Sequence, residues 1–127
     1  MKHLEYQLQK DVCRYISLRY PKVLFLSDTI GNVNLTMLQA ARNKAIQKTG
    51  FACPDLLILQ PNKNYKGLFI ELKIKSPFKK NGELLKNEHL EAQQDAINKL
   101  NTLGYKASFE WDYVSITKLI DSYLKEA

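Results

Sequence analysis

The sequence has few cysteines and no long apolar run. Its two cysteines, Cys13 and Cys53, lack the neighbouring cysteines or histidines of a zinc site, so no structural zinc is expected. No stretch approaches the roughly 18 apolar residues that a membrane span needs. The first residues are also too polar for a secretory signal. These absences favour a soluble, cytoplasmic protein with no membrane partner, whose thiols are reduced rather than paired in a disulfide.

Acidic residues are scarce in the middle of the chain, and the whole chain is basic. Its net charge is +6 and its pI is about 9.3. Between Gln60 and Gly82 there is one acid, Glu71, against six lysines, at positions 63, 66, 73, 75, 79 and 80. A basic excess on a small domain favours a polyanionic partner, above all nucleic acid. The alternative is that the charge serves solubility alone.

The length and the apolar pattern predict one α/β domain over residues 1–127. We expect helices at 2–19, 36–48, 88–103 and after Asp112, the second capped by Thr36 and ended by Gly50. Strands are expected at 23–26, which reads as buried, and at 56–59, 68–74 and 106–111. Segments 27–34 and 76–87 read as loops, the second as a mobile lid. This alternation predicts a mixed central sheet flanked by helices.

The strands at 56–59 and 68–74 carry the most informative polar residues. Asp55 follows Pro54 at the start of the first strand, and Glu71 and Lys73 lie near the end of the second. If the strands pair as an antiparallel hairpin, the two carboxylates and the ammonium converge at one edge of the sheet. Alternating charges also describe an ordinary exposed strand face with a cross-strand ion pair, so the pattern alone leaves both interpretations open.

Two further polar residues lie on or beside apolar helix faces. Glu5 lies at the margin of the first helix's apolar stripe, where the helix dipole alone would also favour an acid. Gln93 fits the apolar stripe of the third long helix, seven residues before Leu100, whereas Gln94 fits it less well. A buried Gln93 needs a hydrogen-bond partner; the alternative is an amide that reaches solvent. Neither His3 nor His89 is expected to be catalytic.

In their order, Glu5, Pro54-Asp55, Glu71-Leu72-Lys73 and Gln93 resemble the PD-(D/E)xK nuclease superfamily, and within it the virus-type replication-repair nuclease (VRR-NUC) family. The resemblance covers nearly the whole chain. It implies a restriction-endonuclease-like αβββαβ core, here with one inserted and one terminal helix. One departure is Ala52, where many members of the family have glycine three residues before the motif aspartate.

The resemblance also implies a chemistry. Asp55 and Glu71 would be the main ligands of Mg²⁺, for which Mn²⁺ could substitute, with the Leu72 carbonyl as a further ligand and Glu5 completing the acidic cluster. Lys73 would act beside the attacking water, and Gln93 would help to organise the site. The implied activity is that of a DNA endonuclease that cuts branched DNA, such as four-way (Holliday) junctions, as a homodimer, and the family suggests a viral or phage origin.

Four lysines are candidate DNA contacts. Lys48 ends the helix expected at 36–48, Lys75 follows the strand expected at 68–74, and Lys79 and Lys80 lie in the loop after it. Lysines of this kind either follow a phosphate backbone or simply solvate the surface. The competing function is therefore a basic nucleic-acid-binding module whose site is inert. Cleavage of DNA that depends on Asp55 and Lys73 distinguishes the two.

Overall fold

The computed structural model describes residues 2–28 and 35–127, and in them the chain forms four helices and four strands around one sheet. The helices are α1 (Lys2–Arg19), α2 (Met37–Ile46), α3 (Glu88–Thr102) and α4 (Tyr113–Lys125). The strands are β1 (Phe25–Ser27), β2 (Leu56–Ile58), β3 (Leu68–Leu72) and β4 (Lys106–Glu110). The predicted α/β order of elements is thus confirmed.

The sheet is mixed, as predicted, with the strand order β1-β2-β3-β4. β1 pairs with β2, and β2 with β3, in antiparallel fashion, while β4 joins β3 in parallel. The chain reaches β4 through α3, which is the connection that two neighbouring parallel strands require. The predicted hairpin of β2 and β3 is confirmed, and it leaves β3 in the centre of the sheet.

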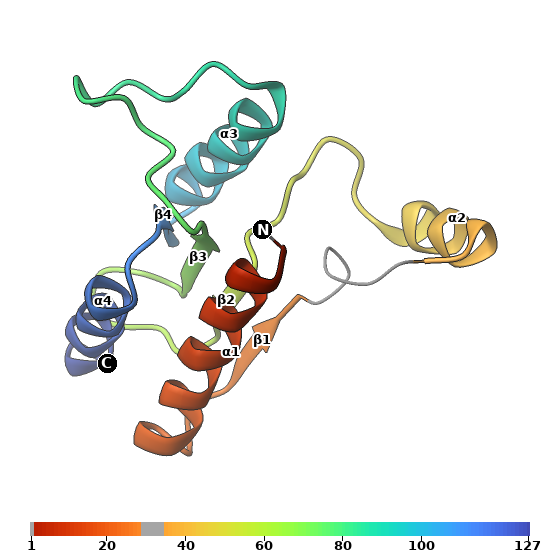
Figure 1. Ribbon diagram of the computed structural model, residues 1–127. Coiled ribbons are helices and arrows are strands. Elements are labelled where there is room, and N and C mark those ends of the chain that lie inside the picture. The colour runs from red at the N-terminus through yellow and green to blue at the C-terminus, as the bar shows by residue number, and fades with distance from the viewer. Residues whose placement is uncertain (1, 29–34) are drawn as a thin grey trace.

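Both faces of the sheet are covered around β3, and all five of its residues are buried. On one face, the side chains of Leu68, Ile70 and Leu72 join a core cluster with residues of α1 and α4. On the other face, Phe69 packs with Ile97 and other residues of α3 and β4. Figure 1 shows α3 apart from α1 and α4, in agreement with these two clusters. Residue 71, which alternates with the first set, therefore lies on the α3 face.

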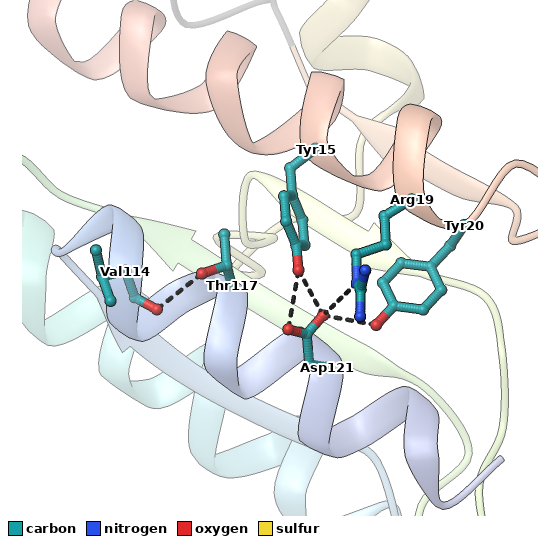
Figure 2. A network of polar contacts seen from close by, with 6 residues as sticks. All are labelled: Tyr15, Arg19, Tyr20, Val114, Thr117 and Asp121. Atoms are coloured by element: carbon teal, nitrogen blue, oxygen red, sulfur yellow. Dashed lines mark hydrogen bonds and ion pairs between the residues drawn. The ribbon is translucent and has the colours of Figure 1, made fainter.

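Helices α1 and α4 are joined by a polar cluster around Asp121 (Figure 2). The Asp121 carboxylate accepts hydrogen bonds from the Tyr15 hydroxyl (2.7 and 2.8 Å) and the Tyr20 hydroxyl (2.6 Å). Arg19 Nε lies 3.6 Å from the same carboxylate. Partial burial opposes ionisation, but the hydrogen bonds from Tyr20 and Tyr15 hold the pKa of Asp121 below its usual value. The cluster fixes α1, and hence Glu5, relative to the sheet.

Three predicted boundaries or burial states are wrong. The strand predicted at 23–26 as buried is β1 at the sheet edge, where Leu24 and Leu26 are 71% and 60% exposed. β3 ends at Leu72 rather than at residue 74. The Lys73 N–H still donates to the Glu110 carbonyl (2.9 Å), but the chain bends at residues 74 and 75. The helix capped by Thr36 ends at Ile46, before Gly50, because Gln47 adopts extended backbone.

The loop predicted at 27–34 lies, beyond residue 28, outside the described residues. The other predicted boundaries agree with the structure to within a residue or two. Asn87 caps α3 and Asp112 caps α4, each by accepting a backbone N–H three residues later. Segment 76–87 contains no helix or strand, but it is anchored: Phe78 pairs with Leu84, and its ring packs edge-on against Phe109. Within residues 2–28 and 35–127, no helix has both the length and the apolar character to cross a membrane.

Candidate active site

Asp55 is placed at the end of β3 by the hairpin register. It precedes β2, and its carboxylate oxygen Oδ2 accepts the backbone N–H of Leu72 at 2.9 Å. Its backbone carbonyl accepts the N–H of Asp28 at 2.9 Å, which ties this point to the end of β1. The sequence prediction that Asp55 lies beside the Glu71–Lys73 segment is therefore correct.

Glu71 is a buried acid, with 4% of its surface exposed. Burial is the main cause that raises its pKa, to about 10, and a hydrogen bond with the Asp55 side chain and the Asp55 charge raise it further. The positive charge of Lys73 opposes this rise, and Glu5 adds to it. Burial and the neighbouring Asp55 thus favour the protonated form of Glu71. The alternative interpretation of an exposed, ion-paired strand face is excluded for Glu71.

Lys73 follows β3 directly and is half-buried. It lies just outside the strand rather than within it as predicted, because β3 ends one residue earlier. It nevertheless lines the same cavity as Asp55, Glu71 and Leu72. The bend after β3 therefore keeps the ammonium beside the two carboxyl groups.

Glu5 reaches the site from the first turn of α1. It is half-buried and lines the cavity, and its charge raises the pKa of Glu71. Gln9, one turn later, is buried and donates to Ser27 Oγ (2.6 Å) and to the Asp28 carbonyl (2.7 Å). Those bonds hold the start of α1 against the end of β1, so Glu5 faces the acids of the hairpin.

Gln93 enters the site from α3 and is 6% exposed, as its place on the apolar stripe predicts. Its Nε2 lies 3.1 Å from Nε2 of His89, one turn earlier. Its Oε1 has no hydrogen-bond partner among the described residues. Gln94 instead bonds Asn98 on the exposed surface, so the preference for Gln93 is correct. The buried amide oxygen calls for a donor such as water.

These residues surround one cavity of about 310 Å³ at the end of β3. It is lined by Glu5, Gln9, Asp28, Ala52, Cys53, Asp55, Glu71, Leu72, Lys73, His89 and Gln93. The cavity also affects the Cys53 thiol. Burial raises the pKa of this thiol, and the nearby acids Asp28, Glu71 and Asp55 raise it further. Four acids from α1, the end of β1 and the hairpin thus face a common space.

The donor set fits a hard divalent cation. Carboxylates, a backbone carbonyl and waters are the ligands that Mg²⁺ prefers, and it keeps several of its waters. The unpartnered Gln93 Oε1 could accept a hydrogen bond from such a water. Among residues 2–28 and 35–127, no three His, Cys, Asp or Glu side chains are arranged to hold a metal together. Metal binding by Asp55, Glu71, the Leu72 carbonyl and Glu5 therefore stays a prediction.

The predicted DNA-contacting lysines fall into different places. Lys75 lines a smaller cavity of about 210 Å³ that shares Glu5 and Lys73 with the first. Lys79 and Lys80 are exposed in the loop before α3, where Lys79 lies 3.9 Å from Glu83. Lys48 lines a separate groove against α3. Lys75 therefore adjoins the site, whereas Lys48 does not.

Four polar residues of the cavity were not predicted as site residues: Gln9, Asp28, Cys53 and His89, the last of which was considered and set aside. Gln9 and His89 each lie four residues from a residue that was singled out, so helical spacing from Glu5 and Gln93 could have found them. Asp28 is the first acid after β1, but only the sheet register brings it beside Asp55. Ala52 also lines the cavity, and it has no positive φ, so the absence of glycine there causes no strain.

Comparison with known proteins identifies the fold. One solved structure, described as a VRR_NUC domain protein, superposes with a TM-score of 0.66 at 22% sequence identity. The match covers 97% of this chain and 89% of the other. No family model matches the sequence, and no curated protein matches it. The chain therefore has the fold of a VRR_NUC domain, as the order of its motifs predicts.

Proposed function

We propose that this protein is a metal-dependent endonuclease that hydrolyses phosphodiester bonds in DNA. The observation that carries the proposal is that buried Glu71, half-buried Asp55 and Lys73 line one cavity. A buried, protonated acid at the end of a central strand is costly for stability, so a functional role is favoured. The VRR_NUC fold supports the same class of activity.

The chemistry of the reaction explains these residue types. The phosphorus of a DNA phosphodiester is shielded by negative oxygens, and water is a weak nucleophile. When bound, Mg²⁺ or Mn²⁺ would neutralise phosphate charge and lower the pKa of a bound water. Asp55, Glu71 and the Leu72 carbonyl are the groups that would hold the ion, with Glu5 near enough to add negative charge.

Lys73 and Gln93 have different roles. The Lys73 ammonium would orient the attacking water and stabilise negative charge that develops on the phosphate. In this role it serves as an electrostatic group rather than as a base. The Gln93 Oε1, buried and without a partner among the described residues, would accept a hydrogen bond from a water of the site. This would fix that water without adding charge.

The preferred DNA is proposed to be branched intracellular DNA, such as a four-way (Holliday) junction. The chain's basic surplus favours binding to phosphates, with Lys75 next to the cavity and Lys79 and Lys80 on the following loop. A homodimer would bring two active sites to two strands of one junction, and two-fold dimers are the commonest oligomers.

A cleavage panel tests this proposal. Linear, flapped, forked and four-way DNA are incubated at equal concentration with Mg²⁺ or Mn²⁺, and with EDTA. We expect cutting of branched DNA that EDTA stops. Asp55→Asn and Lys73→Ala should abolish cutting while DNA binding persists, and Lys118→Ala, on exposed α4 surface, should cut normally.

Two results would contradict the proposal. Cutting that persists in both site variants would reject the assignment of the site. Tight binding of every substrate without cutting would support an inert nucleic-acid-binding module instead.

A further inference from the structure

A cavity of about 530 Å³ lies between β3, the end of α3 and the segment that leads from α2 to β2 (Figure 1). We call it the aromatic cavity, because three aromatic side chains line it: Phe51, Phe69 and Tyr105. The rest of its lining is Lys48, Thr49, Gly50, Lys99, Leu100 and Leu103. Its volume is within the range of about 300–1,000 Å³ that is usual for ligand sites.

Three segments of the chain line both the aromatic cavity and the active-site cavity. On β3, Phe69 lines the first and Glu71 the second, and they are neighbours on one face of the strand, about 7 Å apart. On α3, Leu100 and Gln93 are seven residues apart, about 10 Å along the helix axis. Segment 51–55 also leads from one cavity to the other, over at most about 14 Å. The two cavities are therefore adjacent.

The fold holds the aromatic rings of this cavity in place. Tyr105 packs edge-on against Phe69, with the ring centroids 5.3 Å apart. Phe69 is buried, and Phe51 and Tyr105 are half-buried. Directly before Phe51, Gly50 has a φ of 76°, a backbone conformation that favours glycine. The cavity thus has a formed aromatic wall, and aromatic side chains are the usual partners of nucleobases.

The lining of the aromatic cavity is positively charged, with two lysines and no acid. Lys99 Nζ lies 2.9 Å from Asp95, whereas Lys48 has no ion-pair partner in residues 2–28 and 35–127. Lys66 adds a cation beside the wall, with its Nζ 5.9 Å from the centroid of the Tyr105 ring. A purely apolar ligand would leave these charges unused. A nucleotide matches both features, because it joins a flat aromatic base to a phosphate.

We infer that the aromatic cavity binds one unpaired nucleotide of the DNA strand that enters the active site. The inference rests on the proposed function, since it takes this strand to be the substrate. A base inside a duplex is stacked, so only an unpaired or extruded base can enter a cavity, and unpairing costs least at a branch. At about 3.4 Å per nucleotide along a strand, a separation of about 7–14 Å places it about two to four nucleotides from the cut bond. The cavity would thus favour flapped and forked DNA over fully paired DNA.

DNA binding in EDTA tests the inference without cleavage. The probe is forked DNA with unpaired thymine arms, and fluorescence anisotropy measures its Kd. Leu103→Glu puts a carboxylate on the cavity wall at a 59% exposed residue, and it should weaken binding about tenfold more than Leu18→Glu. Leu18→Glu is the matched control, because it makes the same change of charge at an exposed leucine of α1. Tyr105→Ala should also weaken binding about tenfold, whereas Tyr105→Phe keeps the ring and should bind normally.

Forked DNA with abasic arms separates binding of the base from binding of the phosphates. Abasic nucleotides keep the phosphates and lack the bases, so wild type should bind these arms about tenfold more weakly than thymine arms. Tyr105→Ala should show little difference between the two DNAs. Equal binding of both DNAs by wild type, or equal effects of Leu103→Glu and Leu18→Glu, would overturn the inference. Circular dichroism verifies that each variant is folded.

Photo-cross-linking tests where the nucleotide lies. 5-Iodouracil, which cross-links to aromatic side chains on irradiation, is placed at successive positions of one arm, and Asp55→Asn protein keeps the DNA intact. Mass spectrometry should map the cross-link to Phe51 or Tyr105, from a position about two to four nucleotides from the bond that wild type cuts. The cross-link should disappear when that position is base-paired. Cross-links to neither residue, or equal cross-linking of paired and unpaired positions, would contradict the inference.

These results are separable from those of the nuclease proposal. Base-dependent binding and cross-linking at Tyr105, in a protein that cuts no DNA with Mg²⁺ or Mn²⁺, would leave the nucleotide site standing and reject the proposed function. Cutting that depends on Asp55 and Lys73, with binding that depends neither on the bases nor on Leu103, would do the reverse.

Discussion

Replacing Glu71 by glutamine should stabilise the metal-free protein while it abolishes cleavage. The folded protein holds a proton on Glu71 up to a pKa of about 10, whereas the unfolded chain releases it near the ordinary value of 4.5. Above pH 4.5 the folded state therefore binds more protons than the unfolded state, and its stability falls as the pH rises. Glutamine has the same shape and can still donate to Asp55, but it has no proton to lose.

The magnitude follows from the pH difference. The interval from pH 4.5 to pH 7 is about 2.5 pH units, and each unit corresponds to about 1.36 kcal/mol. Keeping Glu71 protonated in the folded state therefore lowers the free energy of unfolding by at most about 3 kcal/mol at pH 7. Glu71→Gln should therefore raise the free energy of unfolding by up to about 3 kcal/mol at pH 7. For a chain of this size, this corresponds to about 10 °C in Tm. The gain should shrink towards zero near pH 4.5.

Urea denaturation in EDTA at several pH values measures this difference. Glu83→Gln, at an exposed position, is the control and should differ little from wild type at any pH. Added Mg²⁺ should stabilise wild type and leave Glu71→Gln nearly unchanged. A Glu71→Gln protein that is less stable than wild type at pH 7, or a stability difference that does not change with pH, would refute the reasoning.

Two other predictions concern the helix contact and the lysines. Asp121→Asn should lower the free energy of unfolding by about 1–3 kcal/mol because two tyrosine hydroxyls lose an ionised acceptor. Because folding lowers the pKa of Asp121, its contribution to stability should fade as the pH falls below 3.8. Equal stability of the variant and wild type at pH 7 would contradict this role. Lys79→Ala with Lys80→Ala should reduce the slope of log affinity for DNA against log salt by about two, and an unchanged slope would place both lysines outside the DNA interface.

The convergence of the site could be predicted because it depends on local pairing. A hairpin brings the start of β2 to the end of β3, so Asp55 and Glu71 had to meet once the register was right. Gln93 followed from helical spacing on α3. The burial of Glu71 could not be predicted from alternation, because it depends on α3 covering that face of β3. The same limit applies to Asp28, which only the pairing of β1 brings into the cavity.

The exposed leucines show a second limit. An apolar run such as 23–26 predicts a strand, but its composition does not distinguish a buried central strand from an edge strand with exposed side chains. Likewise, the apolar positions of α2 predict a helix and a packing face, but not where that face goes. Lys73 lies outside the predicted strand because β3 ends at Leu72, before a backbone bend that the alternation of residues does not predict.

Proton release on Mg²⁺ binding tests the central claim most directly. Burial and Asp55 favour the protonated form of Glu71 in the metal-free protein, so we expect an ion held by Asp55 and Glu71 to displace that proton. Titration calorimetry in buffers of different ionisation enthalpy counts the protons released. We predict about one proton per chain in wild type and none in Glu71→Gln. Mg²⁺ binding without proton release, or release of the same size from Glu71→Gln, would contradict the claim that this carboxyl pair holds the metal.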